Sequence, residues 1–209
     1  MTSSEAPTAG RRTGRPYDNS GDADILASTL DLLAERDYER LTLDEVAART
    51  GKAKTTLYRR WATKEDIVLA AVHSAGRPPE AEALPDTGSL RADLLAVIDS
   101  PWLGGTERRQ AIFQGLASAT RSSVRLADAI RSDVTDPYVD VYRRLLDRAV
   151  AGGEVAATAA PRIPVLAEVI PAMSSHRLGS GGPAGRDFFV SVIDDVVLPA
   201  LGALRGVAS

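Results

Sequence analysis

The sequence predicts an all-α fold, in which a three-helix N-terminal head with a helix-turn-helix precedes a larger helical body. Three observations carry this prediction. Apolar residues recur at helical spacing along most of the chain, and no alternating strand pattern appears. Capping and glycine signals near the N-terminus separate two short helices. The last segment is apolar on more than one face, which is typical of a helix covered from two sides.

Composition excludes several classes of site. The chain has 209 residues, of which 44% are apolar and 25% charged, as in ordinary globular proteins. It has no cysteine, so disulfides, zinc–thiolate sites and thiol nucleophiles are excluded, and we expect no cofactor. No basic start precedes an apolar run, and no stretch approaches the roughly 18 apolar residues that cross a bilayer. We therefore expect a cytoplasmic protein with no membrane partner.

The positive charge is concentrated near the N-terminus, although the net charge is −3. Six cations and no acid lie between Val46 and Lys64, and a second basic cluster precedes the first helix. A polyanion would meet this part of the chain first. Charge alone would fit a solvated basic face equally well. The cations are Arg49, Lys52, Lys54, Arg59, Arg60 and Lys64, with Arg11, Arg12 and Arg15 in the arm.

The first predicted helix covers residues 22–36. Leu26, Leu30 and Leu33 recur at helical spacing and give it one apolar stripe. That stripe requires other helices to cover it.

The second predicted helix begins at a capping box. Thr42 can accept a hydrogen bond from the N–H of Glu45, whose carboxylate can reach back to the N–H of Thr42. The helix ends near Thr50, because Gly51 stands where a left-handed C-terminal cap is needed.

The third predicted helix covers residues 54–61, with Leu57 and Trp61 facing inward. Its opposite face combines cationic, hydroxyl and aromatic side chains in reach of base edges and phosphates. We call this the recognition face, formed by Lys54, Thr55, Tyr58 and Arg59. A second capping box at Thr63 opens a fourth helix, where Lys64 and backbone N–H groups could hold a phosphate together.

Residues 42–61 therefore have the parts of a DNA-binding helix-turn-helix. An αα-hairpin that only packs would explain the glycine and the apolar positions equally well. It would not explain the basic, acid-free outer face.

The run from Leu41 to Val68, LTLDEVAARTGKAKTTLYRRWATKEDIV, resembles the TetR family of bacterial transcriptional regulators. The resemblance implies a DNA-binding head, a helical body that binds a small effector, a C-terminal dimerisation bundle and, in most members, repression. It implies a homodimer on a palindromic double-stranded DNA operator. It implies base contacts from Lys54, Thr55 and Tyr58, with Arg59 contacting either bases or phosphates. The implied phosphate contacts are Thr42, Thr56, Tyr58, Arg60 and Lys64.

Two positions near the recognition face depart from the pattern or leave alternatives. Ala53 stands where the family commonly has a capping residue, a loss worth roughly 1 kcal/mol. Asp44 could accept from a cytosine amino group or complement the helix dipole, and we favour the dipole role.

The expected organisation has three parts: a basic arm over 1–18, a DNA-binding domain over 19–79 and a ligand-binding and dimerisation domain over 80–209. The arm, with Arg11, Arg12 and Arg15, could enter a minor groove, or it could be a disordered tail with incidental charge.

The body is expected to be helical over 89–100, 107–119, 136–151, 162–178 and 186–201. Asp136 and Pro137 are typical of an N-cap followed by proline at the first helical position, and Pro171 should kink the helix that contains it.

The final helix carries the residues that we assign to a dimer interface. Burial inside the same chain is the alternative explanation of its apolar character. The residues are Phe188, Phe189, Val192, Ile193, Val196 and Val197.

The effector itself cannot be named from the sequence. The candidate cavity residues are mostly aromatic, and for each of them an ordinary core or surface role is the favoured alternative. They are Trp102, Phe113, Tyr138, Tyr142 and Met173, with His73 or His176 as polar contacts.

Two other classes compete with a regulator: an enzyme, and an adaptor that no longer binds DNA. Ser174, Ser175 and His176 are adjacent but follow no strand-to-helix elbow, and the glycine-rich run 179–185 follows a helix rather than a strand. We therefore expect no enzymatic activity and no metal site.

Overall fold

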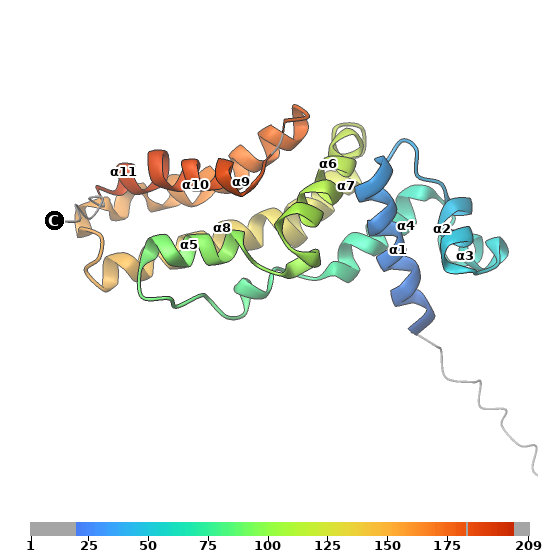
Figure 1. Ribbon diagram of the computed structural model, residues 1–209, viewed down its shortest axis with the longest axis horizontal. Coiled ribbons are helices and arrows are strands. Elements are labelled where there is room, and N and C mark those ends of the chain that lie inside the picture. The colour runs from blue at the N-terminus through green and yellow to red at the C-terminus, as the bar shows by residue number, and fades with distance from the viewer. Residues whose placement is uncertain (1–19, 183, 203–209) are drawn as a thin grey trace, which may run out of the picture.

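The computed structural model describes residues 20–182 and 184–202, and within these ranges it contains helices and no strand. The molecule is elongated, with α1 to α4 at one end and the last described helix at the other (Figure 1). The prediction of an all-α fold is confirmed.

The head contains the helices that the sequence predicts. The Thr42 and Thr63 capping boxes both form, the second through the Asp66 carboxylate. Ala53 provides no side-chain cap, as expected. The helices are α1 (Ser20–Arg36), α2 (Leu43–Thr50), α3 (Lys54–Arg60) and α4 (Lys64–Ala75).

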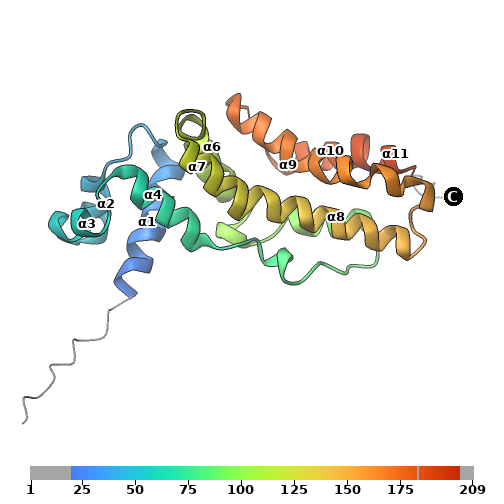
Figure 2. The same ribbon diagram turned by 180° about the vertical axis from the view of Figure 1, so that it is seen from behind.

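The body contains one helix, α7, that the sequence analysis did not predict, and α9 runs through Pro171 as one helix. The longer helices of the body lie side by side in both views (Figures 1 and 2). The long elements are α5 (Leu90–Ile98), α6 (Thr106–Ser122), α7 (Val124–Ile130), α8 (Asp136–Ala151), α9 (Ile163–Gly179), α10 (Arg186–Val192) and α11 (Leu198–Leu201). Short helical turns are η1 (Pro79–Ala81), η2 (Trp102–Gly104), η3 (Arg131–Thr135), η4 (Ala157–Arg162) and η5 (Ile193–Val197).

The predicted N-cap at Asp136 is wrong. Asp136 has helical angles, φ −62° and ψ −42°, and the chain runs from α7 through the wide π-type turn η3 into α8. Proline lacks an N–H, and its ring would clash with the carbonyl four residues earlier in a regular helix. The wide turn before Pro137 accommodates it, and η5 stands in the same relation to Pro199.

Two hydrophobic cores form, and the boundary between them does not follow the chain order. One is built from the body helices. The other combines α1 to α4 with Ile112 and Leu116 of α6 and Leu126 of α7. Figure 2 shows α6 and α7 lying against the head. The head is therefore packed onto α6 and α7 as part of one core.

The crossing of α1 and α6 depends on Gly115. The N–H at Tyr38 donates to the Gly115 carbonyl at 2.8 Å. A Cβ at position 115 would lie 2.1 Å from the Leu33 carbonyl oxygen, which is far inside van der Waals contact. Only glycine permits this approach of the two backbones.

No helix in the part of the chain that the structure describes has both the length and the apolar character needed to span a bilayer.

Candidate nucleic-acid interface and cavity

The helix-turn-helix is held by backbone and capping contacts. Gly51 adopts the left-handed conformation at φ 63°, and the next N–H, of Lys52, donates to the Ala47 carbonyl at 3.1 Å. The N–H of Glu45 donates to Thr42 Oγ1 at 3.2 Å, and the N–H of Thr42 donates to Glu45 Oε2 at 3.1 Å. The capping box fixes where α2 begins, and the Gly51 turn fixes the angle between α2 and α3.

The recognition face lies on the outer side of α3. Leu57 is fully buried beneath it, whereas Trp61, the residue after the helix, is only partly buried against the same core. Tyr58 is 49% exposed, and Thr55 and Arg59 are exposed as well. Among the described residues, Thr55, Tyr58 and Arg59 form no side-chain hydrogen bond or ion pair, so these side chains are available to a partner.

Lys54 of the same face is paired with Asp44 of α2. The two charged groups are 2.6 Å apart, and both side chains are about half exposed or more. The hydrogen bond from Lys54 to Asp44 raises the pKa of the lysine above its ordinary value, so it stays protonated. The sequence suggested a cytosine contact or a helix-dipole role for Asp44, and neither includes the ion pair with Lys54.

Two residues expected to contact phosphate also support the head. Arg60 is ion-paired with Asp22 of α1, and both side chains are largely buried. Lys64 Nζ donates to the carbonyls of Tyr38 and Glu39 at 2.9 and 3.2 Å. It also lies 4.4 Å from the centre of the Tyr38 ring. Both cations therefore connect the third and fourth helices to α1 and the loop after it.

The arm residues Arg11, Arg12 and Arg15 lie outside the described residues, so their expected minor-groove contact is not addressed by the structure.

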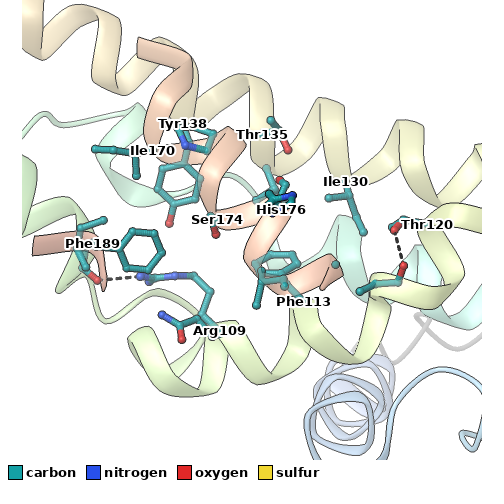
Figure 3. A pocket seen from close by; sticks show the side chains of 18 of the residues that line it. Arg109, Phe113, Thr120, Ile130, Thr135, Tyr138, Ile170, Ser174, His176 and Phe189 are labelled. Carbon is teal, nitrogen blue, oxygen red and sulfur yellow. Dashed lines mark hydrogen bonds between the residues drawn. The ribbon is translucent and has the colours of Figure 1, made fainter. Parts of the chain in front are cut away.

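A cavity of about 480 Å³ lies in the body, between α6, α8 and α9 and closed by parts of α5, η3 and α10. Its volume falls within the range of roughly 300–1,000 Å³ that is typical of small-molecule sites. Phe113, Tyr138 and Tyr142 line it, as the sequence analysis expected, and so does His176. Figure 3 shows Arg109, Tyr138 and Phe189 at one end of the cavity and Thr120 and Ile130 at the other.

The other three candidates lie elsewhere. Trp102 is buried beside the cavity aromatics, with its ring centre 6.4 Å from Phe113, and its indole N–H donates to the Ala75 carbonyl. Met173 packs on the body core. His73 is exposed on α4 and contacts Asp133. We therefore correct these three: they do not line the cavity.

Arg109, the buried cation of the cavity, was not predicted from the sequence. Its side chain is 8% exposed and donates to the carbonyls of Ile98 at 2.8 Å and Ser100 at 3.1 Å. The signal was present in the sequence, because Arg109 shares the apolar stripe of α6 with Ile112 and Leu116. A cation on a buried stripe is unusual enough to mark a site.

Burial also affects the neighbouring phenol. It raises the pKa of Tyr138 to about 12, so the hydroxyl stays protonated at neutral pH and can donate a hydrogen bond.

The six residues assigned to a dimer interface divide into two groups. Four are buried in the core of their own chain, so the alternative explanation holds for them and they do not lie on a contact surface. Phe188 is partly buried, and Val196 is 41% exposed. The four buried residues are Phe189, Val192, Ile193 and Val197.

This fold and recognition face define a helix-turn-helix transcriptional regulator. Residues 25–71 match the family described as "Bacterial regulatory proteins, tetR family". Residues 84–196 match the "Tetracyclin repressor-like, C-terminal domain". The chain belongs to the TetR family of DNA-binding transcriptional regulators.

Relatives of known sequence and structure agree with this assignment. A DNA-binding transcriptional repressor TetR from Mycobacteroides abscessus is 35% identical over 182 residues, covering 84% of this chain and 91% of its own. An uncharacterised HTH-type transcriptional regulator from Mycobacterium bovis is 32% identical, covering 92% and 95%. The solved TetR family transcription regulator SCO0332 is 26% identical with a TM-score of 0.56, over 88% of this chain and 98% of that one.

Proposed function

We propose that the protein is a transcriptional repressor that binds a palindromic operator as a homodimer and releases it when a small molecule occupies the cavity. The observation that carries this proposal is the recognition face: exposed polar side chains on a short helix whose entry angle is fixed by the Gly51 turn after α2. A helix presented in this way enters the major groove of DNA.

The contacts proposed for the face differ in what they require. Thr55 and Tyr58 can contact bases without losing an existing interaction. Lys54 must first break its ion pair with Asp44 before it can contact a base or a phosphate. Arg59 can serve either purpose, and the arm arginines remain candidates for the minor groove. The phosphate contacts proposed are Thr42, Thr56, Tyr58, Arg60 and Lys64, of which Arg60 and Lys64 would keep their supporting role in the head.

Release requires that the cavity and the head influence each other. Helix α6 contributes Phe113 to the cavity wall and, two residues later, Gly115 to the crossing with α1. A ligand that shifts α6 would move the head relative to the body, because the two backbones have no room to slide independently. Such a ligand lowers operator affinity if it favours a spacing of the two heads that does not match the half-sites.

The proposed dimer face lies on the outer side of α9 and of the α10–α11 segment, which run side by side in both views (Figures 1 and 2). Val165 of α9 is 71% exposed and Val196 is 41% exposed. Exposed valines on neighbouring helices are suited to contact with a second copy of the chain.

The test is DNA binding by the full chain. DNA fragments selected from the source genome would define an operator, and fluorescence anisotropy would measure affinity for it without added ligand. We expect Tyr58→Ala and Lys54→Ala each to weaken specific binding by at least about tenfold, since a base contact is worth roughly 1–3 kcal/mol. Arg143→Ala, an exposed arginine of α8, is the control and should bind normally. If both recognition-face variants bind as the wild type does, α3 is not the recognition helix.

We infer no catalytic role for Ser174, Ser175 and His176, which lie along α9 without a strand-to-helix turn. A hydrolase activity abolished by substituting either serine would overturn this inference.

A further inference from the structure

The cavity has an unbalanced charge. Its lining, as far as the structure describes the chain, includes Arg109, Arg121 and His176 and contains neither aspartate nor glutamate. Most of the remaining lining is apolar or aromatic. The cavity therefore favours a ligand that is mainly apolar and carries negative charge.

Arg109 is the buried part of this charge. Among the described residues no carboxylate forms an ion pair with it, and its partners are the backbone carbonyls of Ile98, Ser100 and Trp102. A guanidinium has five N–H donors, so three carbonyl contacts leave two. Glu80 is close enough to influence Tyr138, but it neither lines the cavity nor pairs with Arg109.

Two further donors in the described lining of the cavity have no partner. The Tyr138 hydroxyl and Gln110 Nε2 are buried and form no hydrogen bond, and both residues line the cavity. Figure 3 shows the Tyr138 hydroxyl directed toward the end where Arg109 lies. Buried donors without partners are costly, and an acceptor group placed between them would remove that cost.

A structural role alone accounts for part of this arrangement. Arg109 satisfies carbonyls at the C-terminal end of α5, where the helix dipole is negative. Those contacts explain its position. They do not explain why a buried cation, a phenol and an amide without partners line an apolar cavity whose described lining contains no acid.

We propose that the cavity binds a monoanionic ligand, such as a carboxylic acid with an aliphatic or aromatic body, whose acid group is held at the Arg109 end. Tyr138 and Gln110 donate to the same group, and the apolar body extends toward Thr120 and Ile130. The proposal rests on the proposed function only in taking this cavity to be the effector site.

The test compares two competitors that differ in their head group. N-phenyl-1-naphthylamine, which is uncharged and fluoresces in apolar sites, serves as the reporter on the full-length protein. Decanoate and decan-1-ol then compete for it at neutral pH. We expect decanoate to compete at least about tenfold more tightly than the alcohol, because hydrogen bonds to a charged group are the stronger ones.

Variants of Arg109 and Tyr138 test whether these side chains cause the preference for decanoate over decan-1-ol. Arg109→Met should abolish the preference for decanoate while leaving decan-1-ol almost unchanged. Tyr138→Phe, which keeps the ring, should reduce the preference several-fold, and it decides the matter if Arg109→Met fails to fold. Arg143→Met on the surface of α8 should behave as wild type.

Three results would overturn the proposal: no binding of the reporter, equal competition by acid and alcohol, or an unchanged preference in both cavity variants. Operator binding measured without any ligand is independent of all three. A protein that binds its operator but does not prefer the acid contradicts only this inference, whereas one that prefers the acid and binds no selected DNA contradicts the proposed function.

Discussion

At the scale of single residues, Asp44 and Lys54 show how the basic surface is modulated. They are ten positions apart and belong to different helices, and the Gly51 turn brings their charged groups to 2.6 Å. The pair is exposed, so solvent screening keeps its contribution to stability small. Its main consequence is that a cation of the recognition face is already engaged before DNA arrives.

Asp44→Asn is therefore expected to raise operator affinity several-fold. The change frees Lys54 and removes a negative charge close to the DNA phosphates, while the free energy of unfolding should change little. Anisotropy at two salt concentrations would measure the affinity, and urea unfolding the stability.

The same variant separates the roles considered for Asp44. If the carboxylate instead accepts from a cytosine amino group, Asp44→Asn weakens binding to the operator and changes the preferred base at one position. Thr50→Ser, which keeps a hydroxyl at the end of α2, is a suitable control.

At the scale of helices, α6 is shared by the head core and the cavity, and Gly115 is its tightest point. We expect Gly115→Ala to destabilise the protein by at least about 1–3 kcal/mol, because the added Cβ meets the carbonyl of Leu33, which is backbone and cannot rotate away. Chemical denaturation would measure the loss. If the variant folds, its operator affinity should also fall, since α1 must move.

Gly179→Ala is the matched control for this prediction. It lies at the end of α9, and no heavy atom lies within 4 Å of its added Cβ. Equal stability of the two variants would contradict the proposed role of the α1–α6 crossing.

Helix boundaries were predictable where the signal is local. The caps at Thr42 and Thr63 and the turn at Gly51 depend on residues within four positions of one another, and all three form. Helix α7 was missed although Ser123 caps it by accepting from the N–H of Leu126. The N-cap predicted at Asp136 was wrong, because this residue lies inside a longer helical segment.

At the scale of the whole molecule, the cavity and the exposed faces depend on which helices meet. Phe113, Tyr138 and Tyr142 were expected to line a cavity, and they do, because inward-facing aromatics of adjacent helices converge. Sequence spacing cannot distinguish a side chain that lines a cavity from one that is packed beside it, as Trp102 is. It also cannot tell which face of the last helix is covered by its own chain, so four buried residues were assigned to a dimer interface.

The proposed dimer interface can be tested directly. The outer side of α9 and of the α10–α11 segment is left with exposed valines, and we expect the double variant Val165→Glu and Val196→Glu to weaken dimerisation by roughly 100-fold or more, because burying unpaired carboxylates costs several kcal/mol. Sedimentation equilibrium would measure the dimer dissociation constant. Operator affinity should fall in parallel, since two heads are needed to occupy both half-sites.

Val124→Glu provides the control for surface charge. Val124 is 76% exposed at the first position of α7, close to the head, where a carboxylate complements the helix dipole. This variant should dimerise as the wild type does. A double variant that also remains dimeric would place the contact on another face, and the spacing of the two heads on DNA would then be set by different helices from those proposed here.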